Sequence, residues 1–555
     1  MKRFAMFWAA RAAAAVLGAF CAFPAAGQEP TVISAHPGQR KTVSLPPSTA
    51  QGVPLSLSQA VSIAVNNNED QYVTVNAAQS FEYLIIQNKG IFDPLISAAV
   101  GRSHAEIPAA SAITSGVFDD TSFSGNVSQL TPFGGTFQLG FTGTREKTNN
   151  QFATVNPSYG GGLTLSVNQP LLRNFGTMPT TWLIRIAKNS RDSAYQDLVR
   201  SIQGTVNAVE QAYWDLVYAL QNLEVKRESL RIASELNRIT RIKIDVGSLA
   251  PIDITQTEVG IATAQQDIIT AEGLIGDAQD RLKRLLNFVD PAQINIPIIP
   301  TDQLSTEQVT IALEEGTQVA LRRRPEILSI SYTVASDLLR YEYYRNQTLP
   351  ALNLTGSYGS RGLAGLVVDP VTGAVVTDTN FSQTYQDVLH RRNKNWAIGL
   401  NFSYPILNRG AKGATGVARY NWEADRARLV AEEQNVVVEV RAAARAIDTA
   451  QRQIGASGKG RELAERNLDA EKKKFDNGMS TTFQVNQIQR DLSAARTLEQ
   501  QALAIYRKAL AGYHFALADN LDWKGIRVEG LPESAPPVLE VEGGVPPPGP
   551  PPPVK

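Results

Sequence analysis

The chain has 555 residues, with 53 basic and 53 acidic residues and a formal net charge of zero. A zero balance gives no long-range attraction for a phosphate backbone, so composition argues against a nucleic-acid partner. Mean hydropathy is −0.17 and no run of about 18 apolar residues occurs past residue 27, which excludes a helical membrane span there. A transmembrane β-barrel is not excluded, because its strands alternate in polarity.

Residues 1–27 have the pattern of a secretory signal peptide. Basic Lys2, Arg3 and Arg11 precede an apolar stretch, and small residues follow up to a cleavage site expected after Gly27. The alternative is a membrane anchor, for which the apolar stretch is too short. The pattern therefore predicts an exported protein.

The single cysteine lies inside this segment. Cys21 follows the bulky Phe20, whereas a lipoprotein signal has a small residue before its cysteine. The mature chain is therefore expected to lack cysteine, which leaves no disulfide, thiol catalysis or zinc–thiolate site.

Both ends of the mature chain are expected to be disordered. Residues 28–54 are rich in Pro, Ser, Thr and Gly, and residues 531–555 end in a run of prolines at 546–553. Proline runs favour polyproline II and cannot join a helix or a central strand. A solvated tail is favoured here over a proline-rich recognition motif.

Between these ends the chain contains one pattern twice, at 55–300 and 301–530. Four landmarks of the first copy recur in the same order in the second: residues 57–66 and 313–322, Pro94 and Pro350, Pro170 and Pro405, and Gly247 and Gly478. We therefore predict an internal duplication, with a helix–strand–strand–helix unit in each copy.

Long helices are predicted in both copies. Residues from about 180 to 244 contain no proline, and their apolar residues follow the 3-4 spacing of a coiled-coil seam from Val206 to Leu230. The corresponding stretch at about 412–475 is rich in alanine. It contains Gly455, Gly458 and Gly460, which predict a kink or an irregular turn.

Glycines predict where these helices end. Gly247 and Gly478 suit the left-handed position that stops a helix, and returning helices are predicted at about 253–288 and 483–518. Each half is therefore expected to form a long helical hairpin with its tip at one of these glycines.

The segments between the helices alternate as strands do. Ile398, Leu400 and Phe402, for example, are separated by small or polar residues. Four strands are clear, and a further hairpin would add two more: 95–104, 161–170, 350–359 and 396–405, then 121–130 and 134–144.

The apolar face of these strands has two readings. It would point inward in a soluble sandwich and towards lipid in a membrane barrel. Strand edges cannot be left open in lipid, so one chain with this few strands would have to close its barrel across subunits. The signal peptide favours the membrane reading, and with it a homo-oligomer whose tube is part barrel and part helix.

The chain resembles the TolC-like outer membrane efflux proteins over residues 55–520. The resemblance rests on an ordered set of segments rather than on one decisive motif: residues 55–57, Ala60 and Ala64, residues 209–218, 169–171, 324–326, Leu349 with Pro350, Tyr404 with Pro405, and the two tips. It implies a homotrimer whose outer-membrane β-barrel has 12 strands, four from each chain, and continues as an antiparallel coiled-coil α-helical tunnel in the periplasm. The additional hairpin at 121–144 departs from the simplest members and leaves the strand count open.

The resemblance also implies partners and docking positions. The hairpin tips would dock on a periplasmic adaptor (membrane fusion) protein that connects the duct to an inner-membrane pump, while the barrel contacts outer-membrane lipid. By match, the docking residues are Val246, Gly247, Ser248 and Leu249 at the first tip, and Asn477, Gly478, Met479 and Ser480 at the second.

An aperture just beyond the tips is implied as well. The candidates are Asp253 and Gln256 after the first tip and Gln484 and Gln487 after the second. The family type carries acidic residues where Gln484 and Gln487 stand, so an acidic ring is not expected at that level. These glutamines either belong to the gate or form a solvated helix face that seals by packing or not at all.

Residues that would carry catalysis or bind a metal do not form a recognisable pattern. His36, His104, His390 and His514 are scattered without the spacing of metal ligands. The run at 455–460 faintly resembles a phosphate loop but lacks Ser or Thr after Lys459. We therefore expect no enzyme activity, no cofactor and no metal.

The leading hypothesis is an outer membrane channel of a tripartite efflux or type I secretion system, acting as a passive exit duct. The alternative is a periplasmic coiled-coil scaffold protein that forms no channel and whose β segments make a soluble sandwich. An enzyme would need a convergent polar site, and the sequence offers none.

Overall fold

A computed structural model of the chain describes residues 52–526, apart from 68, 109–115, 151, 289–293, 307–310, 370, 371 and 373. The predicted signal peptide with Cys21, the expected linker up to residue 51, and the proline-rich tail lie outside the described residues.

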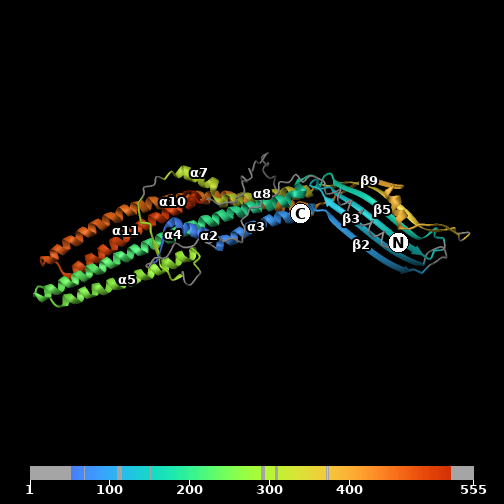
Figure 1. Ribbon diagram of the computed structural model, residues 1–555. Helices are drawn as coiled ribbons and strands as arrows, with labels where there is room; N and C mark the ends of the chain where they lie inside the picture. Colours follow the sequence, from blue (N-terminus) through green and yellow to red (C-terminus); the bar gives the residue numbers. More distant parts are fainter. Residues whose placement is uncertain are drawn as a thin grey trace. The chain divides into compact units, whose positions relative to one another are not determined.

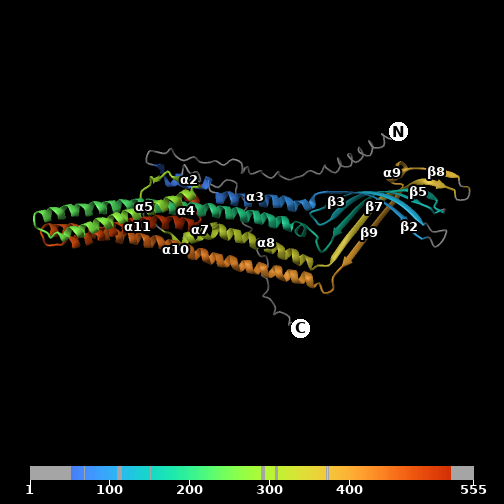
Figure 2. The same ribbon diagram turned by 90° about the horizontal axis from the view of Figure 1, so that it is seen from below.

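Two helices of 68 residues each form the longest elements, α4 (Met178–Asp245) and α10 (Arg409–Asp476). Each returns through a shorter helix, α5 (Ile252–Leu285) or α11 (Thr482–Leu517). The four helices run side by side in both ribbon views, with α11 in contact with α4 (Figures 1 and 2). The two predicted helical hairpins are confirmed.

The kink predicted at 455–460 is wrong, because α10 is helical throughout this stretch. An isolated glycine weakens a helix by about 1 kcal/mol relative to alanine but does not end it. Packing of α10 along α11 outweighs that local cost. None of the helices in the described part of the chain is both long enough and apolar enough to cross a membrane.

Each half of the chain also begins with two shorter helices. The first half has α2 (Leu57–Asn67) and α3 (Glu69–Lys89), and the second has α7 (Leu313–Arg323) and α8 (Pro325–Gln347). A 3₁₀ turn, η1 (Gly90–Phe92), follows α3, and a short helix, α12 (Asn520–Trp523), follows α11.

A two-stranded ribbon fastens the start of the first half to the start of the second. β1 (Val53–Leu55) pairs in parallel with β6 (Ile298–Pro300). The linker expected up to residue 54 therefore ends before Val53. Tyr213 of α4 donates to the Asp302 carboxylate at 2.6 Å just beyond β6.

The seam predicted on α4 is buried. Val206, Val209, Tyr213 and Leu216 are completely covered, and they pack in one cluster with residues of α2 and α5. A second cluster joins α10 to α7 and α11. Burial of these apolar stripes, rather than helix propensity alone, holds such long helices in place.

The strands form one antiparallel sheet in the order β2-β3-β4-β5-β7-β9. Its long members are β2 (Leu95–Glu106), β3 (Val117–Leu130), β4 (Thr136–Thr148), β5 (Val155–Pro170), β7 (Ala351–Val368) and β9 (Asn393–Ser403). A four-residue strand, β8 (Val375–Asp378), pairs with the far end of β7. The described part of the chain thus contains the four expected strands and the possible extra hairpin, which forms as β3 and β4, giving six long strands.

The two faces of the sheet differ in polarity along its whole width. One row of cross-strand partners is apolar on every long strand: Ile96, Val127, Leu139, Leu165, Tyr358 and Trp396. The next row, on the opposite face, is small or polar on every long strand: Ser97, Asn126, Gly140, Thr164, Gly359 and Asn395. We call these two sides the apolar face and the polar face.

A helix that the sequence did not predict covers part of the apolar face. α9 (Phe381–Leu389) begins at Asn380, whose side chain accepts a hydrogen bond from the Ser382 amide. It lies over three glycines that are partners across neighbouring strands, Gly143, Gly161 and Gly362. An added Cβ would meet the α9 backbone at Gly362 and side chains at Gly143 and Gly161, so the missing side chains leave room for α9 here.

Candidate functional site: hairpin tips and apolar face

The two hairpin tips close with the same backbone motif. At the first, the Gly247 amide donates to the Ile244 carbonyl at 2.8 Å and the Ser248 amide donates to the Lys243 carbonyl at 2.7 Å. At the second, Gly478 and Met479 donate in the same way to Phe475 and Lys474, at 3.1 and 2.8 Å. This is the Schellman motif, and it requires the positive φ of +77° at Gly247 and +74° at Gly478.

The tips expose apolar side chains. Val246 is 71% exposed and Met479 is 70% exposed, and both stand directly beside the tip glycines. Ile252 and Phe483, in the first turns of the returning helices, are exposed as well. Exposed apolar residues gathered at the end of a rod are typical of a protein–protein contact surface.

The predicted docking residues do not all face outward. Ser480 is half-buried, and its hydroxyl donates to the Glu471 carboxylate at 2.6 Å. This hydrogen bond, followed by the one from Lys474, lowers the pKa of Glu471. Ser480 therefore fastens the second tip to α10, whereas Val246, Gly247, Ser248, Asn477, Gly478 and Met479 are exposed and Leu249 is half-buried.

Lys243 joins the two tips, and no pattern in the sequence pointed to this role. Its Nζ donates to the Phe475 carbonyl at 2.6 Å, lies 4.0 Å from the centre of the Phe475 ring, and lies 3.7 Å from Asp476. Phe475 also belongs to an apolar cluster with Leu236 and Val485. The two hairpins are thus held together at the level where each one turns.

The candidate aperture residues lie on two neighbouring helices. Asp253 is half-buried in the first turn of α5, Gln256 is exposed on α5, and Gln484 is exposed in the first turn of α11. Gln487 is half-buried. The two helices are joined at this level by Asn486, whose side-chain amide donates to the Gln256 backbone carbonyl at 3.1 Å.

Gln487 is also tied to its own helix. Its amide donates to Asp491 at 3.1 Å and accepts from Arg490 at 2.6 Å. The charged groups next to the glutamine were not identified from the sequence, because an i,i+3 or i,i+4 pair on a polar helix face is common. An acidic residue, Asp491, therefore lies one helical turn after Gln487 and contacts it directly.

Polar side chains are buried between the helices above the tips, beside the apolar cluster of Leu236, Phe475 and Val485. The Asn237 amide donates to Thr257 at 2.6 Å in a buried contact, and Thr240 and Thr482 are also fully buried. Polar contacts of this kind stabilise less than an apolar seam of the same size.

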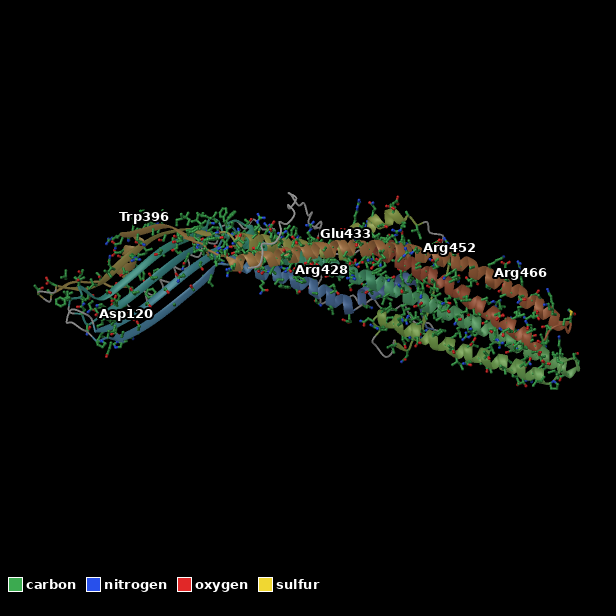
Figure 3. All side chains as sticks on the ribbon, turned by 180° about the vertical axis from the view of Figure 1, so that it is seen from behind. Asp120, Trp396, Arg428, Glu433, Arg452 and Arg466 are labelled. Carbon is green, nitrogen blue, oxygen red and sulfur yellow. The ribbon has the colours of Figure 1, made fainter. Side chains whose placement is uncertain are left out.

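The outer surface of the helices is strongly charged. The side chains of Glu433, Arg452 and Arg466 extend outward from α10. Trp396 lies on β9 in the sheet (Figure 3). Trp396 is 72% exposed and Ile398 is 74% exposed. The same chain thus has a charged surface on its helices and an exposed apolar surface on its sheet.

No group of three or more His, Cys, Asp or Glu residues within the described ranges is arranged to hold a metal ion. His104 contacts Asp119 at 2.7 Å on the sheet and His514 contacts Asp519 at 2.9 Å near α12. These histidines lie on different elements and do not converge on one site.

Comparison with known proteins gives a consistent result. The model of the outer membrane efflux protein family matches residues 134–287 and 317–517. The chain is 22% identical over 228 residues to Toxin and drug export protein A of Aggregatibacter actinomycetemcomitans, covering 40% of this chain and 48% of that protein. The match thus spans about half of that relative's length.

A longer match is to Nodulation protein T of Rhizobium leguminosarum bv. trifolii, at 20% identity over 388 residues, covering 68% of this chain and 75% of that protein. Among solved structures, the Campylobacter jejuni CmeC outer membrane channel is similar in fold. Its TM-score is 0.58 at 17% sequence identity, covering 84% of this chain and 86% of that one.

Proposed function

The chain belongs to the outer membrane efflux protein family, and on that premise we propose that it forms the outer membrane exit duct of an efflux or secretion machine. It is an outer membrane channel protein with its long helices in the periplasm. Transport work belongs to a partner pump, while this chain supplies a water-filled passage, a gate and a docking surface.

The observation that carries this proposal is the apolar face of the sheet, which is exposed outside the part that α9 covers. Val100, Ile398 and Leu400 are 83%, 74% and 62% exposed, and they lie on strands whose other face is small and polar. A soluble protein would have to cover such a surface, whereas a lipid bilayer solvates it and water fills the polar side. We propose that three copies close the sheet into a barrel around that polar side.

The helical hairpins then continue the passage into the periplasm. A closed ring of three chains brings six hairpins together, and their tips would present Val246 and Met479 at its end. We propose that these exposed apolar residues, with Gly247 and Gly478, dock a periplasmic adaptor protein that links the duct to an inner-membrane pump. Ser480 is a positioning residue of this surface, since its hydroxyl is engaged by Glu471.

The gate is proposed at Asp253, Gln256, Gln484 and Gln487. At this level the hairpins meet through the Asn486–Gln256 hydrogen bond and through an apolar cluster that includes Phe475 and Val485. We propose no enzyme activity and no cofactor.

The proposal is tested with two neighbouring variants on β9. Leu400 lies on the apolar face and Asn401 on the polar face. An arginine facing lipid at the middle of the bilayer costs about 2–4 kcal/mol, whereas a channel-facing position tolerates it. We expect Leu400→Arg to abolish membrane insertion and Asn401→Arg to insert normally.

The readouts are detergent dependence of the purified protein and single-channel recording in planar bilayers. The wild type and Asn401→Arg should need detergent and conduct ions, with altered ion selectivity in the variant. A wild-type protein that stays soluble without detergent and never conducts would instead identify a periplasmic scaffold, and the duct proposal would be rejected.

A further inference from the structure

We infer that the hairpin formed by β3 and β4 is part of the membrane wall, so that three copies close a barrel of eighteen strands, six from each chain. This inference rests on the proposed trimeric duct and adds the width of its outer-membrane part. The resemblance by itself implies twelve strands.

The two edges of the sheet can be joined only to another copy. Within the described residues, β2 pairs only with β3, and β9 pairs only with β7, so each has one unpaired edge of 12 or 11 residues. Unpaired backbone groups are not tolerated in the hydrocarbon core. β2 leads away from the end of α3, while β9 leads back to α10, so an edge-to-edge contact between copies is antiparallel like every other pair in the sheet.

The additional hairpin has the properties of a wall segment. β3 and β4 contain 14 and 13 residues, enough to cross a bilayer, for which about 9–11 tilted residues are needed. They pair continuously with β2 on one side and β5 on the other. A loop lying outside the barrel would leave β2 and β5 to pair with each other, which they do not.

The polarity of the hairpin matches that of its neighbours in the middle of the sheet. Val127 and Leu139 lie in the apolar row between Ile96 and Leu165, and Asn126 lies in the polar row. A plug within the passage would be wet on both faces, and a loop outside the membrane would need no apolar face. The alternation is what a strand between lipid and water requires.

Adding two strands also preserves closure. An inserted pair keeps the up-and-down order, the even strand number and the assignment of faces, because Ile96 and Leu165 remain in one row on one face. Barrel diameter grows roughly linearly with strand number, so eighteen strands give about one and a half times the diameter of twelve and about twice the cross-section. The exit at the outer membrane would therefore pass bulkier cargo than a twelve-stranded barrel.

The first test is electron cryo-microscopy of the full-length protein in lipid nanodiscs. A trimer whose membrane section contains eighteen strands supports the inference. A trimer with twelve strands and the hairpin outside the wall overturns the inference but leaves the proposed duct intact. A protein that does not enter nanodiscs at all overturns the proposed duct itself.

A cysteine pair gives a second test that does not depend on imaging. The only natural cysteine is Cys21 in the expected signal peptide, so single cysteines introduced in the mature chain can be labelled selectively. We compare Val127→Cys on the apolar face with Asn126→Cys on the polar face of the same strand. In liposomes, a membrane-impermeant thiol reagent should label Asn126→Cys and leave Val127→Cys unlabelled.

Equal labelling of both cysteines by that reagent would place β3 outside the membrane wall and overturn the inference. As a third measurement, residues 107–154 are replaced by a short turn so that β2 pairs directly with β5. The barrel of this variant should shrink to about two thirds of the wild-type diameter. If the deletion variant assembles with an unchanged diameter, the hairpin does not belong to the wall.

Discussion

Lys243 of the first hairpin caps the end of α10 in the second: its Nζ donates to the Phe475 carbonyl at 2.6 Å while lying 4.0 Å from the centre of the Phe475 ring. The same nitrogen lies only 3.7 Å from Asp476. A cation near the carboxyl end of a helix is favourable, and the aromatic ring and the carbonyl add to that attraction. One side chain thus connects two hairpins whose tips are 231 residues apart in the chain.

Replacing this lysine should loosen the tips. Lys243→Met keeps the apolar stem but removes the charged hydrogen bond and the cation–π contact, together worth about 1–3 kcal/mol. We expect a longer and broader distance distribution between spin labels at Ser248 and Met479, measured with labelled chains diluted into unlabelled ones. Single-channel recordings should show more frequent opening.

The matched control is Lys226→Met. Lys226 pairs with Asp267 at 3.0 Å, but that ion pair joins the two helices of one hairpin rather than two hairpins. Its loss should leave the Ser248–Met479 distance unchanged. Equal broadening in both variants would show that Lys243 has no special role in holding the tips together.

The tip glycines can be tested for docking separately from folding. Nothing lies within 4 Å of an added Cβ at Gly247, but its positive φ makes any L-residue unfavourable by about 1–2 kcal/mol. Gly247→Asn tolerates this conformation, whereas Gly247→Arg adds bulk and charge to the exposed tip. We expect Gly247→Arg to assemble normally and to abolish export, while Gly247→Asn retains most of it.

Gly273→Arg serves as a surface control, because Gly273 is exposed on α5 and has equally open surroundings. The measurement is dye accumulation in cells whose export depends on this channel, alongside oligomer mass in detergent. Normal export by Gly247→Arg and the equivalent Gly478→Arg would remove the tips as docking sites.

The buried pair of Glu210 and Lys524 predicts a pH-dependent stability. Glu210 of α4 is 2% exposed, its carboxylate lies 3.2 Å from the Lys524 Nζ, and burial raises its pKa. A carboxyl whose folded pKa is raised contributes stability below its unfolded pKa, about 4.3, and loses it as pH rises through the folded pKa. Lys524 offsets part of that loss when the carboxylate is charged.

We therefore expect Lys524→Met to destabilise the protein at pH 7.5 by about 3–5 kcal/mol, since it leaves a buried charge unpaired. The loss should be smaller at pH 5, where Glu210 is more easily protonated. The double variant with Glu210→Gln should recover most of the stability at pH 7.5. The measurement is thermal unfolding of the wild type and both variants at both pH values, and equal losses of stability in Lys524→Met at the two pH values would contradict the assignment.

The close contact between α9 and the sheet predicts a position-specific effect. A Cβ added at Gly362 would overlap the backbone carbonyl of Thr384, which no side-chain rotation can relieve. Gly362→Ala should therefore lift α9 from the apolar face and destabilise the sheet by about 1–3 kcal/mol. Limited proteolysis of assembled protein should cut more rapidly near α9.

Gly356→Ala is the control on the same strand and the same face, where an added Cβ meets nothing within 4 Å. Its proteolysis pattern and thermal stability should match those of the wild type. A Gly362→Ala variant that behaves like Gly356→Ala would show that α9 is not held at this position.

The sequence alone determined the main elements and their order, namely the long helices, the hairpin tips and the long strands. The duplication, the two hairpin tips and the alternating strands are local patterns, because a helix end needs only its glycine and a strand face needs only every second residue. The apolar seam from Val206 to Leu216 was identified for the same reason. Even the additional hairpin was visible, although its place in the sheet was not.

Only the tertiary structure decided which elements meet. No local pattern connects the residues that meet in three contacts. These are the Lys243–Phe475 contact, the Ser480–Glu471 hydrogen bond and the packing of α9 on three glycines. Strand pairing settled that β3 and β4 stand between β2 and β5. Such contacts depend on how the whole fold packs, because the spacing of residues along the sequence does not determine the distance between residues that are far apart in the chain.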